Sequence, residues 1–178
     1  SASARGVRSL SQSTTRMTKL VLPNHTNSRG QAFGGWVLKQ LDLAAFNAAQ
    51  RHHRGSSPPV TVSIDHVSYL APALVGQVLT VDAAVTRSFG SSMEVEITMR
   101  CEDPARPEWG TWAVLHSYAT FVAVGDDGRA AKVSELVPSN SAERAAFDAA
   151  GERRAGRLAA GAHARRAVRL QIVKEKVV

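Results

Sequence analysis

Alternating hydrophobic and polar residues mark four stretches that are typical of β-strands. They cover residues 60–70, 77–87, 92–102 and 111–124, and a shorter run of the same kind covers 17–23. Pro, Gly, Ser or Asp, which favour turns, bound these runs. Parallel pairing needs crossover connections, and the segments between the four longer runs are too short for them. The pattern therefore predicts an antiparallel sheet.

A different spacing of apolar residues predicts a helix over residues 36–53. This stretch is rich in Ala and contains no Pro or Gly, and its apolar residues fall on one broad arc at about 100° per residue. The arc consists of Val37, Leu38, Leu41, Ala44, Ala45, Ala48 and Ala49. Because the alanines let another element approach closely, we expect this helix to be central and buried. A second helix, with Arg on its exposed side, is predicted to begin within residues 139–142.

Together these elements predict an α+β fold, an antiparallel sheet wrapped on a long central helix with a helical extension after it. The length of 178 residues suits a single domain. We expect a basic, flexible arm at residues 1–16, the main domain at 17–138, and a carboxyl-terminal helix and basic tail at 139–178.

Charge is distributed unevenly along the chain. The net charge is +7, but residues 1–41 contain six basic side chains and no acidic one, residues 42–150 sum to −5, and residues 151–178 sum to +6. A nucleic-acid-binding domain would gather its basic residues on one folded face, so this pattern makes nucleic-acid binding the less favoured reading. No apolar run approaches the roughly 18 residues that a membrane span needs, and we predict no membrane span.

The cysteine and histidine content gives no sign of a metal site. Cys101 is the only cysteine, so the chain cannot form an internal disulfide. No histidine has the spacing of a metal ligand, and His52 and His53 fall at the end of the predicted helix, where positive charge is favoured. We expect neither a metal nor a cofactor.

The amino-terminal segment is rich in Ser and Arg and lacks acidic residues. Its sequence is SASARGVRSLSQSTTR, and this composition is typical of organellar transit peptides. We therefore expect a mitochondrial protein, with a cytoplasmic location as the alternative. A disordered tail or a cloning remnant also fits the same composition.

Gly34 and Gly35 precede the predicted helix, and Asp42 lies on it. The first amides of a helix have no partner within it and stand at the positive end of the helix dipole, so they can hold an anionic or carbonyl oxygen. Eight residues of helix span about 12 Å, more than a short carboxylate can reach. If the glycine amides and Asp42 act on one substrate, two subunits must supply them. A simple turn at the glycines and a solvated structural Asp remain the alternatives.

Four segments together resemble the hotdog-fold acyl-CoA thioesterases of the acyl-CoA hydrolase branch. The segments are LPNHTNSRGQAFGGWVLKQLDLAA, SIDHVSYLAPALVGQVLTVDAAV, GSSMEVEITM and YATFVAV, and the resemblance covers residues 17–138. It implies a helix wrapped by an antiparallel sheet, homodimers with a continuous sheet, and a trimer of those dimers. It also implies hydrolysis of acyl-CoA to free fatty acid and CoA.

The resemblance further implies roles for individual residues. Asp42 corresponds to the general base or nucleophile. Gln31 occupies the position after the loop glycine, where relatives commonly have Asn or Asp, so its amide is one methylene longer than that of Asn. The amides of Phe33, Gly34 and Gly35 would stabilise the oxyanion of the thioester carbonyl, a role that suits helix-start N–H groups.

A second region of the resemblance concerns CoA. Relatives often carry an Arg in the turn that here reads RSFGSSMEV, and Gly90 stands in its place. The resemblance implies that Ser91 and Ser92 bind CoA near its phosphates, with Arg87 as a substitute for the missing Arg. An ordinary hairpin turn is the alternative.

The changed positions Gln31 and Gly90, with the basic ends, leave a second function open. In it the domain is catalytically weak or inactive and serves as a structural subunit of a larger mitochondrial assembly.

Overall fold

The computed structural model describes residues 7–55 and 57–175, and for 162–175 only the backbone. It contains two α-helices, five strands and three short 3-10 turns within these ranges. They are α1 (Gly34–His53), α2 (Ser141–Glu175), β1 (Thr15–Leu20), β2 (Val60–Tyr69), β3 (Val78–Phe89), β4 (Ser92–Glu102), β5 (Thr111–Val122), η1 (Leu10–Gln12), η2 (Pro23–His25) and η3 (Pro107–Trp109).

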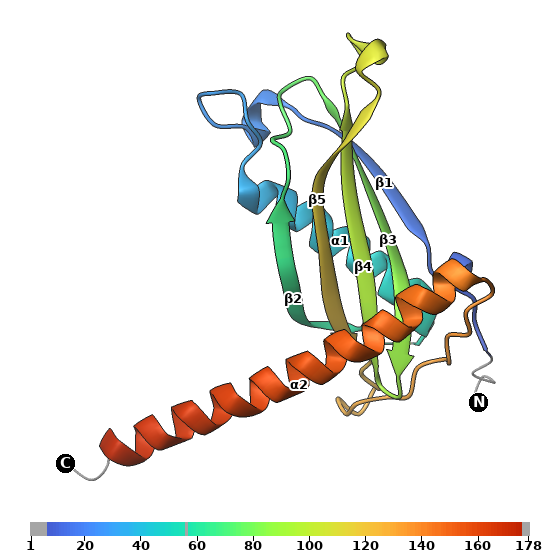
Figure 1. Cartoon of the computed structure of the whole chain (residues 1–178), viewed down its shortest axis with the longest axis vertical. Helices are drawn as coiled ribbons and strands as arrows, with labels where there is room; N and C mark the ends of the chain where they lie inside the picture. Colours follow the sequence, from blue (N-terminus) through green and yellow to red (C-terminus); the bar gives the residue numbers. More distant parts are fainter. Residues whose placement is uncertain (1–6, 56, 176–178) are drawn as a thin grey trace.

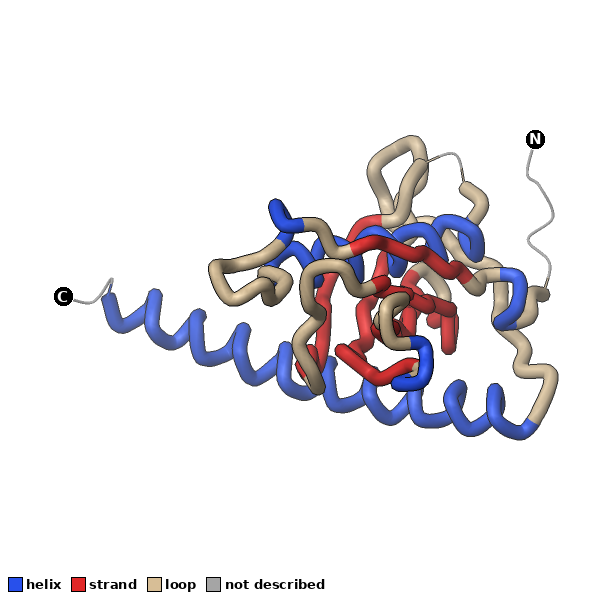
Figure 2. Tube along the Cα trace, turned by 90° about the horizontal axis from the view of Figure 1, so that it is seen from above, coloured by secondary structure: helices blue, strands red, loops and turns tan. Residues whose placement is uncertain are grey.

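The strands form one antiparallel sheet in the order β1-β3-β4-β5-β2. Helix α1 lies against one face of this sheet, and α2 crosses the other face and projects beyond β2 (Figures 1 and 2). The predicted α+β arrangement is confirmed. β2 is an edge strand, and its apolar residues Val60, Val62, Ile64 and Tyr69 are exposed.

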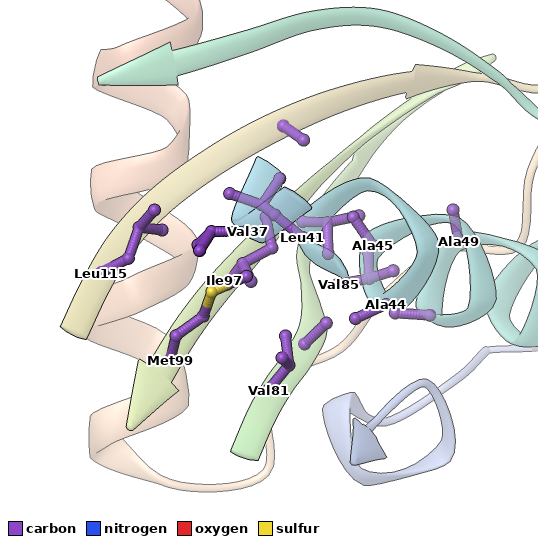
Figure 3. Close-up of a cluster of buried hydrophobic side chains, with 14 of the residues drawn as sticks. Val37, Leu41, Ala44, Ala45, Ala49, Val81, Val85, Ile97, Met99 and Leu115 are labelled. Carbon is purple, nitrogen blue, oxygen red and sulfur yellow. The ribbon is translucent and has the colours of Figure 1, made fainter. Parts of the chain in front are cut away.

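The hydrophobic core fills the space between α1 and the sheet. Small residues of α1, among them Ala44, Ala45 and Ala49, face inward-pointing side chains of β3 and β4 such as Val81 and Ile97 (Figure 3). Because the alanines are fully buried, the helix lies close against the strands. Along each strand, apolar side chains that point into this core alternate with polar side chains on the outer face of the sheet, and this alternation is the pattern that predicted the strands.

At the amino end the structure differs from the predicted boundary. Thr15 and Arg16 already belong to β1, and the Oγ of the buried Ser13 accepts a hydrogen bond from the backbone of Val85 at 3.0 Å. Arg8 donates its backbone N–H to the carbonyl of Glu135 at 2.8 Å. These polar contacts hold residues 8–16 on the domain. A pattern of hydrophobic residues does not reveal contacts of this kind, so the sequence did not predict them. Residues 1–6 of the predicted arm lie outside the described residues.

The arginines of α2 were expected on its exposed side, and this expectation is wrong for Arg153, Arg154 and Arg157, since Arg154 donates to Ser92 of β4 at 2.9 Å. Arg153 and Arg157 point to the sheet and donate to Glu94 at 2.7 and 2.9 Å, and Arg157 also contacts Asp65 at 3.2 Å. Glu94 is fully buried in β4, where it also accepts a hydrogen bond from Thr86 at 2.9 Å. Buried charge must be paired, so these ion pairs fix the helix on the sheet.

His52 also differs from its sequence-based interpretation. It is fully buried instead of presenting positive charge at the helix end, and its Nε2 lies 2.9 Å from the carbonyl oxygen of Ser134. Burial lowers the pKa of His52 from its usual value, and the hydrogen bond to Ser134 opposes this only in part. His52 therefore joins the end of α1 to the segment that leads to α2.

Candidate active site

The loop before α1 is organised by Asn27. Its Oδ1 accepts hydrogen bonds from the backbone amides of Arg29 at 2.9 Å and Gln31 at 3.2 Å. Gly30 closes the turn with a φ of +71°, a conformation that suits glycine. With its oxygen engaged, Asn27 has a side-chain amide that can donate to a ligand. Sequence reasoning assigned the amide role to Gln31 and missed Asn27, although the run Asn-Ser-Arg-Gly is a recognisable turn signal.

Gln31 pairs with Leu74 in an isolated bridge, and its carbonyl accepts from the amide of Asn27 at 2.9 Å. Its side chain makes no hydrogen bond within the described part of the chain. Both amide-bearing residues thus lie in the loop that leads into α1.

The start of α1 presents unpaired backbone amides. Phe33 precedes the helix and donates its own N–H to the carbonyl of His25 at 2.9 Å, so this amide is occupied. For the amides of Gly34 and Gly35 we find no acceptor among the described residues, as expected for the first turn of a helix. They belong to the free donors of the first helix turn, which lie at the positive end of the helix dipole.

The two glycines differ in the space beside them. A Cβ on Gly34 would lie 3.2 Å from the hydroxyl of Tyr69, whereas a Cβ on Gly35 would meet nothing within 4 Å. Tyr69 donates this hydroxyl to the carbonyl of Gly34 at 3.0 Å. The last residue of β2 therefore fixes the position of the helix start.

Asp42 lies in the middle of α1, half-buried at the side that faces β2. One of its carboxylate oxygens, Oδ1, accepts a hydrogen bond from the hydroxyl of Thr61 on β2 at 3.0 Å. The second oxygen has no protein donor in the described residues and can face a ligand. Thr61 is a further candidate that sequence reasoning missed, because only tertiary contact brings β2 to this helix turn.

One chain does not bring the helix start and Asp42 together. Gly34 and Asp42 lie on the same helix, about 12 Å apart along its axis. The carboxylate is nevertheless next to β2, the exposed apolar edge of the sheet. Unpaired, apolar edges of this kind are where a second chain adds to a sheet.

The residues predicted for CoA binding lie at the opposite end of the sheet from the helix start. The register places Ser92 level with Val122 and Val60, whereas Tyr69 is level with Leu115. Ser92 accepts a hydrogen bond from Arg154 at 2.9 Å. Ser91 stays in the tight β3–β4 turn.

Arg87 packs on α2. Its guanidinium lies 4.0 Å from the ring centre of Phe147, and it donates to the carbonyl of that residue at 3.1 Å. The structure therefore brings Ser92 together with Arg154 of α2, whereas the guanidinium of Arg87 interacts with Phe147.

The described residues contain no group of three or more His, Cys, Asp or Glu that could hold a metal ion. A search of the same residues finds no helix with the length and apolar character to cross a membrane. The candidate site thus consists of an amide pair, a carboxylate, and the side chains of Asn27, Gln31 and Thr61.

Residues 29–108 match the Thioesterase superfamily. An uncharacterized acyl-CoA thioester hydrolase of Zymomonas mobilis is 33% identical over 117 residues, which is 66% of this chain and 76% of that protein. Mouse acyl-coenzyme A thioesterase 11 is 38% identical over 143 residues, 80% of this chain. The chain spans only about a quarter of the length of this mouse relative, 23%.

Two solved structures are similar over nearly the whole chain. The acyl-CoA hydrolase of Staphylococcus aureus, solved with butyryl coenzyme A, coenzyme A and coenzyme A disulfide, shares 29% identity at a TM-score of 0.84 and covers 96% of this chain and 99% of its own. A hexameric acyl-CoA thioesterase shares 30% identity at a TM-score of 0.82 and covers 88% and 97%. Variants of the Staphylococcus enzyme with Ala in place of an Asp, a Thr and an Asn have also been solved.

Proposed function

The chain belongs to the thioesterase superfamily, with the hotdog fold, and from this premise we propose that it hydrolyses acyl-CoA thioesters to the free acid and CoA. The observation that carries the proposal is the Asp42 carboxylate, which Thr61 holds by one oxygen at 3.0 Å while the other stays available. The relatives named as acyl-CoA hydrolases support the substrate class.

In the proposed reaction Asp42 acts on water or on the thioester carbonyl. As a carboxylate it either takes a proton from the attacking water or attacks the carbonyl carbon directly. The thioester oxygen gains negative charge in both routes, and the free amides of Gly34 and Gly35 stabilise it. The hydroxyl of Thr61 keeps the carboxylate in one orientation.

Asn27 and Gln31 are two candidates for orienting the thioester or the water. In the Staphylococcus enzyme the varied Asn stands 15 residues before the varied Asp, and Asn27 stands 15 residues before Asp42. This spacing supports Asn27 as the principal donor. Gln31 then has the lesser role, and Asn27→Ala is expected to lower kcat more than Gln31→Ala does.

We further propose that the site forms between two copies of the chain. Pairing of β2 with the β2 of a second copy would cover its exposed apolar residues and extend the sheet, and would let the helix start of one subunit approach Asp42 of the other. The hexameric relative supports a trimer of such dimers. Acyl-CoA is the proposed small-molecule partner.

We propose that the CoA end of the substrate contacts Ser91, Ser92 and Arg87. The hydroxyl of Ser92, which lies next to an arginine, supports this proposal.

Mitochondrial localisation is also a proposal, and it rests on the Ser- and Arg-rich composition of residues 1–16. A human relative is named as cytosolic. A fluorescent fusion with and without residues 1–16 tests this localisation, and a cytosolic signal in both contradicts it.

The test of the function is the release of free CoA from acyl-CoAs of increasing chain length, with Asp42→Asn beside the wild type. We expect the variant to lose about a hundredfold or more in kcat, the scale of a missing acid or base. Asp148→Asn is the matched control, since Asp148 is exposed on α2. Equal rates for Asp42→Asn and wild type, or no wild-type hydrolysis of any chain length, would contradict the proposal.

A further inference from the structure

Tyr69 is the last residue of β2 and lies beside the first turn of α1. Its backbone pairs with the buried Leu115 of β5, and the next residue, Leu70, donates its N–H to the carbonyl of Val114 at 2.8 Å. The sheet therefore fixes the backbone from which the side chain extends. The Tyr69 hydroxyl donates to the carbonyl oxygen of Gly34 at 3.0 Å, so it links the sheet to the first residue of the helix.

The oxygen that Tyr69 holds and the N–H of Gly35 belong to one peptide unit. This unit is planar, and its C=O and N–H point in opposite directions. A donor that fixes the oxygen of Gly34 therefore also fixes the direction of the Gly35 N–H, which is one of the free donors of the first helix turn. A hydrogen bond to the oxygen also polarises the unit and makes its N–H a stronger donor.

The glycine at position 34 makes room for this hydrogen bond. Neither Gly34 nor Gly35 has a positive φ, and Gly is a poor helix former, so the backbone conformation alone does not call for glycine. A Cβ at position 34 would lie 3.2 Å from the Tyr69 hydroxyl and 3.7 Å from the ring carbon Cζ. A larger residue would therefore displace the hydroxyl from the carbonyl.

The hydroxyl is a suitable donor at neutral pH. Burial raises the pKa of Tyr69 above its ordinary value, so the group stays protonated. The carbonyl oxygen of Gly34 has two lone pairs, one for the N–H of the next helix turn and one for Tyr69. The hydroxyl therefore adds to the hydrogen bonding of the helix without replacing it.

We propose that Tyr69 is a positioning residue for thioester hydrolysis, whose hydroxyl acts through the Gly34 carbonyl to orient the Gly35 amide toward the thioester oxygen. The proposal rests on the function proposed above. Negative charge on that oxygen grows only as the carbonyl carbon is attacked, so a well-aligned donor stabilises the transition state more than the bound substrate. Loss of the hydroxyl should therefore lower kcat and leave KM unchanged.

Steady-state hydrolysis of acyl-CoA by Tyr69→Phe, which removes only the hydroxyl, tests this separation of kcat from KM. We expect kcat to fall about 2- to 10-fold, the effect of one neutral hydrogen bond on the barrier, at an unchanged KM. A wild-type kcat in Tyr69→Phe would overturn the proposal, whatever the KM.

Tyr118→Phe is the matched control, since Tyr118 is the other tyrosine of the chain. Its hydroxyl lies 3.3 Å from Oε1 of Glu96, and its side chain lines a cavity beside α2. We expect this variant to keep the kcat and the KM of the wild type. An equal fall of kcat in the two variants would overturn a specific role of Tyr69.

Nuclear magnetic resonance detects the same hydrogen bond without substrate. Gly34 and Gly35 form the only Gly-Gly pair of the chain, so glycine labelled with ¹³C in its carbonyl and with ¹⁵N gives a single amide bonded to a labelled carbonyl. Loss of the hydrogen bond changes the polarisation of this peptide unit. We expect both resonances to shift in Tyr69→Phe and to stay in place in Tyr118→Phe, and unchanged resonances in Tyr69→Phe would overturn the proposal.

The two measurements also separate this proposal from the function on which it rests. A wild-type protein that releases no CoA refutes the function, and with it the role of Tyr69, even where the resonances shift. An unchanged kcat of Tyr69→Phe in an active enzyme refutes the role of Tyr69 alone.

Discussion

Glu94 is expected to be the residue on which the attachment of α2 depends most. Its carboxylate is 0% exposed and accepts hydrogen bonds from Arg153 at 2.7 Å, Arg157 at 2.9 Å and Thr86 at 2.9 Å. Glu94→Gln keeps the shape but removes the charge and turns one acceptor into a donor that faces an arginine. Each hydrogen bond to a charged group contributes about 1.5–3 kcal/mol.

The expected loss is smaller than the sum of these contributions. Arg153 and Arg157 are 25% and 21% exposed, so water can solvate them in part once Glu94 is neutral. We therefore expect Glu94→Gln to lower the free energy of unfolding by about 2–4 kcal/mol. Earlier proteolytic cleavage within α2 should accompany this loss, because the ion pairs hold that helix on the sheet.

Urea unfolding at one fixed protein concentration measures the effect, since oligomer formation makes stability depend on concentration. Glu96→Gln is the control on the same strand and the same face. Glu96 is 37% exposed and pairs with His116 at 2.9 Å, so its change should cost less than about 1 kcal/mol. A Glu94→Gln protein no less stable than Glu96→Gln would refute the reasoning.

Two further predictions concern buried titratable groups. Burial lowers the pKa of His52, so the folded state favours the neutral ring. The unfolded chain takes up the proton first as the pH falls below the ordinary value of about 6.5. The free energy of unfolding should therefore decline from pH 7 to 5. Urea unfolding of His52→Gln at the same pH values should show a shallower decline. An equal decline of the free energy of unfolding in the two proteins would contradict the assignment to His52. Burial raises the pKa of the Cys101 thiol to about 11, so iodoacetamide should label Cys101 only in urea, and fast labelling of the native protein would contradict its burial.

The sequence predicts most of the fold because core burial follows a simple period. Residues such as Val81 and Ile97 alternate with polar ones, and the arc from Val37 to Ala49 repeats at helical spacing, so the strands and α1 occur within a few residues of their predicted bounds. Residues 8–16 were missed because polar groups such as the Ser13 hydroxyl hold them, and hydropathy does not report such contacts.

The candidate site was predictable only in part, for a related reason. The glycines stand out because they come directly before the predicted helix, and Asp42 stands out because it is a carboxylate on a helix that is expected to be buried. The contact between Thr61 and Asp42, and the inward direction of Arg153 and Arg157, depend on elements far apart in the sequence. His52 was misinterpreted because a helix end exposed to water and one buried under the segment at Ser134 have the same local sequence.

A complementation assay tests most directly whether the proposed thioesterase site is shared between two subunits. Asp42→Asn and Asn27→Ala remove groups from different sides of the proposed site, and each variant alone should release almost no CoA from acyl-CoA. When the two are coexpressed, half of the random pairs are mixed and each mixed pair has one intact site out of two. We therefore expect about a quarter of the wild-type activity. Coexpressed variants that are as inactive as each one alone, in preparations shown by mass spectrometry to contain mixed oligomers, would contradict a site built from two chains.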